Sequence, residues 1–190
     1  MRVFSVATIV LFVATTSASA HTAGGSASSF HAGLAHPISG LDHVTAMIAV
    51  GMLAAFKGGR ALWLWPLSFV GMMAIGGVLG FGHVRLPYVE IGIAASVLIL
   101  ALMVVLSIVP SLWTGAALIA GFAILHGHAH GSELPHSANG LAFALGFSTA
   151  TIFLHSVGIG LVVGWKAIAR SPTNVPVGYF ATSSRKQIAS

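Results

Sequence analysis

Residues 31–56 read HAGLAHPISGLDHVTAMIAVGMLAAF and join a polar half to an apolar half. The polar half holds His31, His36, Asp42 and His43, although the whole chain has only three acidic residues. The apolar half has the composition of a membrane span. An ionisable group at the mouth of such a segment is a functional candidate, so the pattern indicates a polar site at one edge of a membrane domain.

The composition of the whole chain is that of a membrane protein. Only 6% of the 190 residues are charged and 56% are hydrophobic, whereas soluble domains carry about 25% charged residues. The net charge of +5 comes from eight basic residues that form no basic stripe, so nucleic acid is not an expected partner. The chain has no cysteine, which excludes disulfides and thiolate ligands. Its ten histidines are the unusual feature.

The sequence predicts an all-α, polytopic transmembrane helical bundle with about five spans after a cleaved signal peptide. Each apolar segment is long enough to cross ~30 Å of hydrocarbon at about 1.5 Å per residue. Short connections make neighbouring spans antiparallel, and the long last segment is expected to tilt or bend. The predicted spans are residues 37–56, 61–81, 88–109, 111–130 and 138–165.

The two ends of the chain differ from this apolar domain. Arg2, a short apolar run and small residues before His21 form the pattern of a secretory signal peptide. The expected organisation is a signal peptide at 1–20, a periplasmic histidine-containing tail at 21–35, a transmembrane domain at 36–170 and a polar cytoplasmic tail at 171–190.

The predicted spans can be oriented in a membrane. A cleaved signal places the mature N-terminus in the periplasm and the C-terminus in the cytoplasm. Most of the basic residues then lie inside, as the positive-inside rule requires, and all four tryptophans lie at the inner interface. All three carboxylates and most histidines gather on the outer side: Asp42, Glu90, Glu133, His36, His43, His83, His126, His128, His130 and His136.

The first polar motif, HPISGLDH, begins at His36. On a continuous helix beginning near Pro37, His36 and His43 fall within about 20° of one another, two turns apart. Asp42 either ligates a metal or holds the second ring nitrogen of a ligating histidine. Met47, one turn below His43, is a secondary candidate for a thioether ligand, although packing is the more common role of such a methionine.

The second polar motif, HGHAHGSELPH, begins at His126. A continuing helix would align His126, His130 and Glu133, because these are spaced i, i+4 and i+3, while His128 points elsewhere. The glycines and proline of the motif indicate that the helix loosens here. Imidazole and carboxylate ligands together suit Ni²⁺, Co²⁺, Zn²⁺ or Cu²⁺, so the two motifs predict metal binding.

Four further residues have two open interpretations each. Glu90 begins the third span, where an acid either complements the helix dipole or lies on an ion path. His155 lies deep in the last span and either joins helices or lies on that path. His21 and His31 either concentrate metal or belong to a linker. No phosphate loop, nucleophile triad or nucleotide fingerprint is present, so no enzyme activity is expected.

The two motifs resemble those of the HupE/UreJ family of bacterial membrane proteins, associated with nickel supply to hydrogenase and urease. AHPISGLDHVTAMIAVG matches the first family pattern and LHGHAHGSE the second, with Leu125 at an aromatic position. Family members usually end with a further hydrophobic helix, but SPTNVPVGYFATSSRKQIAS is too polar to span. The resemblance implies metal-site roles for His36, Asp42, His43, His126, His130 and Glu133.

The resemblance implies transport of nickel across the inner membrane, with capture at an outward-facing site, to supply hydrogenase or urease maturation proteins. Co²⁺, Zn²⁺ and Cu²⁺ are compatible with the same ligands. The alternative is a membrane-bound metal chaperone or assembly factor that binds the ion without conducting it. A histidine-ligated haem carrier is a weaker alternative, because the histidines gather at one surface.

Overall fold

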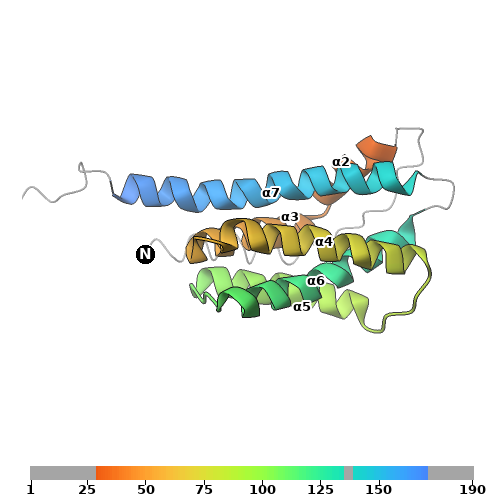
Figure 1. Ribbon diagram of the computed structural model, residues 1–190, viewed down its shortest axis with the longest axis horizontal. Helices are drawn as coiled ribbons and strands as arrows, with labels where there is room; N and C mark the ends of the chain where they lie inside the picture. Colours follow the sequence, from red (N-terminus) through yellow and green to blue (C-terminus); the bar gives the residue numbers. More distant parts are fainter. Residues whose placement is uncertain (1–28, 135–138, 171–190) are drawn as a thin grey trace, which may run out of the picture.

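The computed structural model describes residues 29–134 and 139–170, and within these ranges every regular element is an α-helix (Figure 1). The predicted all-α bundle is therefore confirmed. The predicted signal peptide, His21, His136 and the polar tail at 171–190 lie outside the described residues. The helices are α2 (Ser29–Ser39), α3 (Leu41–Lys57), α4 (Ala61–Phe81), α5 (Val89–Val105), α6 (Leu112–Glu133) and α7 (Gly140–Ala169).

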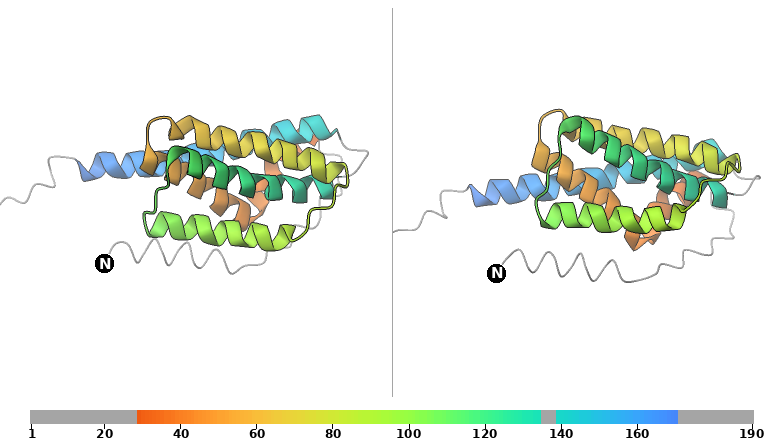
Figure 2. Two further views of the ribbon diagram at one scale, coloured as in Figure 1. Left: turned by 60° about the horizontal axis from the view of Figure 1, so that its bottom comes forward. Right: turned by 90° about the horizontal axis from the view of Figure 1, so that it is seen from below.

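The long helices lie side by side with their axes roughly parallel (Figures 1 and 2). By length and composition, α4, α6 and α7 are each able to cross a membrane, and α2 with α3 form one bent pair that passes the same test. Helix α5 is apolar but has only 17 residues. Each of the five predicted spans thus corresponds to a helix, although three, or four with the bent pair, meet the length criterion.

The first predicted span is broken. Helices α2 and α3 meet at Gly40 with a bend of 82°, so the predicted continuous helix through His36 and His43 is wrong. Ser39 Oγ donates to the His36 carbonyl at 2.7 Å and satisfies one of the last carbonyls of α2. The Gly40 carbonyl then accepts from Val44 N at 3.0 Å and starts α3. Helix α2 begins inside the segment that was expected to be a tail.

Glycines bring the helix backbones into direct contact. A Cβ at Gly127 would overlap the Met73 carbonyl of α4, and a Cβ at Gly51 would overlap the His155 carbonyl of α7. Small residues have this role in membrane bundles, where close packing replaces the hydrophobic drive between helices. The predicted loosening of the second motif is therefore wrong, because α6 continues through Gly127 to Glu133 and its glycines pack against α4.

The opposite end of the bundle is held by side chains. Lys166 Nζ on α7 donates to the Ala55 carbonyl near the end of α3 at 2.9 Å. Trp65 is completely buried and its Nε1 donates to the Leu112 carbonyl at 2.9 Å. Trp65 therefore belongs to the core, whereas the other three tryptophans are more than half exposed.

Candidate metal centre

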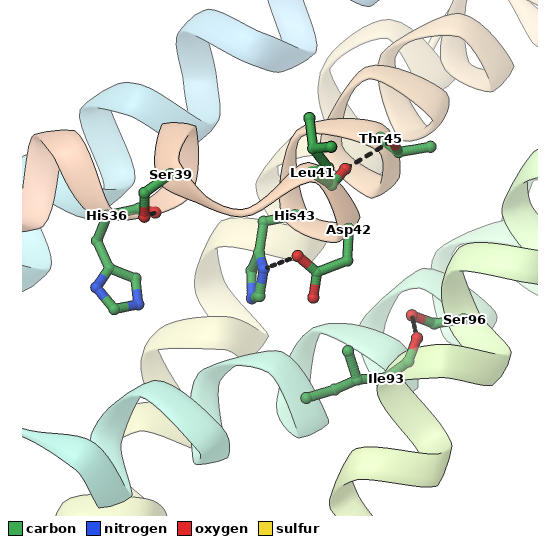
Figure 3. Close-up of polar contacts among 8 residues, drawn as sticks. All are labelled: His36, Ser39, Leu41, Asp42, His43, Thr45, Ile93 and Ser96. Atoms are coloured by element: carbon green, nitrogen blue, oxygen red, sulfur yellow. Dashed lines mark hydrogen bonds and ion pairs between the residues drawn. The ribbon is translucent and has the colours of Figure 1, made fainter. Parts of the chain in front are cut away.

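Four histidines from three helices converge at one end of the bundle. His130 of α6 lies at their centre, with ring centroids 4.6 Å from His36 of α2 and 4.5 Å from His43 of α3. His126, one turn before His130, lies 5.2 Å from His43. Figure 3 shows that His36 and His43 point the same way from the two sides of the break, toward α6. These four residues are called the histidine cluster below.

Two members of the histidine cluster have a tautomer fixed by a hydrogen bond. His43 Nδ1 donates to Asp42 Oδ1 at 2.9 Å (Figure 3), and His126 Nδ1 donates to the Phe122 carbonyl at 3.0 Å. In both rings the lone pair is therefore left on Nε2, which is buried and has no partner among the described residues. This arrangement is typical of metal-ligating histidines, whose second nitrogen donates to a carboxylate or a carbonyl.

His130 is the most exceptional member of the cluster. Both of its ring nitrogens are buried and lack a hydrogen-bond partner within the described residues. Buried polar groups without a partner are costly and rare. Ligand atoms of His36, His130 and Glu133 all lie within 4.8 Å of one another, with Glu133 exposed at the outer side. The donor set is thus imidazoles with carboxylates, which suits a borderline divalent cation.

Aromatic rings close the inner side of the histidine cluster. Phe147 of α7 lies 4.6 Å from His130. Phe69 of α4 lies 5.9 Å from His126 and 5.2 Å from His155, so one buried phenyl ring separates the cluster from the deep histidine. Sequence reasoning did not identify these phenylalanines, because apolar residues are abundant in every membrane helix and spacing alone does not show which ones face a polar group.

The other candidates lie outside the histidine cluster. His128 Nε2 donates to the Val84 carbonyl at 2.6 Å, so it faces the connection between α4 and α5, as its spacing predicts. Met47 is completely buried in the hydrophobic core. Glu90 is exposed in the first turn of α5 and His31 is exposed on α2. Neither belongs to the group formed by His36, His130 and Glu133.

A family model described as HupE / UreJ protein matches residues 9–184. The chain belongs to the HupE/UreJ family. It is 48% identical over 132 residues to Protein HupE of Rhizobium leguminosarum bv. viciae, which covers 68% of each chain. No solved structure matches the chain. HupE/UreJ membership confirms the resemblance drawn from the two motifs and, with the apolar helices, makes this a helical membrane protein.

Proposed function

We propose that this HupE/UreJ protein captures Ni²⁺ at the histidine cluster, with Asp42 and Glu133, and carries it across the inner membrane to supply hydrogenase or urease maturation. The observation that carries the proposal is the set of buried imidazole nitrogens on α3 and α6 that lack a partner within the described residues, with the His36 ring of α2 packed against them. The choice of Ni²⁺ rests on the family resemblance, because the donors alone would equally accept Co²⁺, Zn²⁺ and Cu²⁺.

The proposed orientation places the histidine cluster on the periplasmic side. Lys166 and Lys57 mark the opposite end of the bundle, where Lys166 contacts the end of α3. Basic residues at that end favour a cytoplasmic location. The predicted signal peptide would then place the mature N-terminus in the periplasm and the C-terminus in the cytoplasm.

The proposed path leads inward from the histidine cluster. Glu133 and Asp42 lie at its more exposed side, and His126 lies deeper, against Phe69. His155 is buried on the other side of Phe69, and both of its ring nitrogens lack a partner in the part of the chain that the structure describes. It is the proposed inner stop for the ion or its proton. Glu90 has a secondary role in this proposal, since its side chain is exposed.

One observation favours the alternative of a metal chaperone that does not conduct the ion. Below the histidine cluster, α3 contributes an apolar core that contains the buried side chains of Met47, Val50 and Leu53. A hydrated or partly hydrated cation does not cross such a core without a rearrangement of the helices. In that case the protein would hold the ion at the membrane surface and deliver it to a partner.

The two functions are separated by ⁶³Ni²⁺ accumulation in proteoliposomes. For the permease we expect saturable uptake that falls at least about tenfold in both Asp42→Ala and Glu133→Ala. The loss of a residue that only holds a metal ligand in place already costs ~10–100-fold in metal affinity. Gly121→Ala is the control, because a Cβ there meets no atom within 4 Å. Tight Ni²⁺ binding without accumulation would favour the chaperone, and no Ni²⁺ binding would contradict both.

Ni²⁺ binding is expected to weaken in acid. An imidazole must be neutral to ligate a metal, and its ordinary pKa is about 6.5. Protonation competes increasingly as the pH falls, so affinity is lost in the acidic direction. Once the imidazoles become protonated, the affinity is expected to fall on the order of tenfold or more. Calorimetric titration with Ni²⁺ at several pH values measures this change, and an affinity that rises as the pH falls would contradict capture by histidine.

A further inference from the structure

Gly40, at the break between α2 and α3, lies directly over the bond between Asp42 and His43. A Cβ built on Gly40 would lie 2.8 Å from Asp42 Oδ1 and 2.9 Å from His43 Nδ1. These are the two atoms that form the 2.9 Å hydrogen bond of the pair. Gly40 itself is buried. The volume that any other side chain would need is therefore occupied by the carboxylate and the imidazole.

The backbone conformation of Gly40 does not call for glycine. Its φ of −108° and ψ of 119° are extended values that any residue adopts. Gly40 is also the N-cap of α3, a position at which serine, threonine, aspartate or asparagine usually caps the helix through its side chain. As a glycine, Gly40 offers no side-chain cap to α3. A glycine is thus needed here because the Asp42–His43 pair occupies the side-chain volume, and not because the backbone conformation requires it.

Gly40 also differs from the glycines that pack helices together. At Gly51 and Gly127 an added Cβ would overlap backbone carbonyl oxygens of a neighbouring helix, which cannot move without separating the helices. At Gly40 the nearest atoms belong to the side chains of Asp42 and His43 rather than to a backbone, and side chains can rotate. A side chain at position 40 is therefore compatible with the fold but not with the bonded Asp42–His43 pair.

We propose that Gly40 is a positioning residue of the metal centre. Its missing side chain lets the Asp42 carboxylate and the His43 imidazole fold back over the start of α3 and remain bonded. The bond fixes the His43 tautomer and holds its ring against His126 and His130. The inference rests on the proposed Ni²⁺ capture. It adds to the metal centre a residue that supplies no ligand atom itself.

The test is calorimetric Ni²⁺ titration of the full chain in detergent, together with its thermal unfolding midpoint. Gly40→Ala and Gly40→Ser are expected to bind Ni²⁺ about tenfold more weakly, as is typical when a residue that orients a metal ligand is changed. Their unfolding midpoints are expected to match the unaltered chain or, for serine, to exceed it, because serine is a better N-cap. Gly121→Ala is the control and is expected to keep both values, since its Cβ meets no atom within 4 Å.

A double-mutant cycle separates positioning from a hinge role. In the Asp42→Ala background no bonded pair remains, so Gly40→Ala is expected to add less than about a twofold loss. Equal losses in both backgrounds would overturn the inference and point to the backbone at the break. Unchanged binding in Gly40→Ala would also overturn it, while leaving the proposed function intact. Absence of Ni²⁺ binding by the unaltered chain would overturn the proposed function and the inference together.

Discussion

His130→Ala is expected to abolish specific Ni²⁺ binding, with a loss of affinity on the order of 100-fold or more. Changes to residues that only support a metal ligand cost ~10–100-fold, and the loss of a ligand itself is expected to cost at least as much. The expectation follows from the position of His130 at the centre of the histidine cluster, in ring contact with His36 and His43. It is also the cluster member with both nitrogens unpartnered within the described residues.

The measurement is calorimetric titration of the purified protein with Ni²⁺, supported by ⁶³Ni²⁺ uptake. His128→Gln is the matched control, because it removes a histidine two positions away on the same helix that faces Val84 instead. Glutamine keeps an N–H donor for the Val84 carbonyl, so the buried acceptor is not left unsatisfied. The control is expected to bind as the unaltered chain does. Equal losses in the two variants would show that the number of histidines matters rather than their geometry.

Gly127→Val is expected to lower the free energy of unfolding by about 3 kcal/mol, the upper end of the range for overpacking. Its side chain would overlap the Met73 carbonyl and force α4 away from α6. Backbone atoms cannot rotate aside as side chains do. Because Gly127 is next to His126, the same displacement is expected to disturb the histidine cluster and weaken Ni²⁺ binding.

Gly121→Val is the control for this prediction. It lies on the same helix, gains the same β-branched side chain and has the same helix propensity change, but a Cβ there meets no atom within 4 Å. The difference between the two variants therefore isolates the helix contact. It is measured by unfolding in mixed micelles with increasing denaturing detergent. Equal stability of the two variants would mean that α4 and α6 do not approach through Gly127.

The two polar motifs show how far local sequence reasoning reached. The spacing of His126, His130 and Glu133 was sufficient to align them, because all three lie on one regular helix. The spacing of His36 and His43 was not, because it assumed a helix that in fact ends at Ser39. The break is marked by Pro37 and Gly40, but proline and glycine also occur within continuous membrane helices and so do not by themselves predict a break.

The role of Asp42 required three-dimensional information of a finer kind. Its sequence position next to His43 permitted either direct ligation or support of the ring. The 2.9 Å contact between Asp42 Oδ1 and His43 Nδ1 favours support of the ring, and the role of Asp42 in metal binding stays a prediction. Phe69 and Phe147 were identified only from their ring contacts, since nothing in the local pattern separates them from the other apolar residues of α4 and α7.

The sequence by itself determined the helical membrane class, the family and the polar residues of the predicted site, because charged and polar groups are so costly in a bilayer that the few present stand out. The tertiary structure decided how they meet. It turns α2 by 82° from α3 at Gly40 and brings His36 and His43 onto His130. The physical reason is that contacts between residues far apart in the chain depend on close packing of helix backbones, and helical periodicity carries no information about the partner helix.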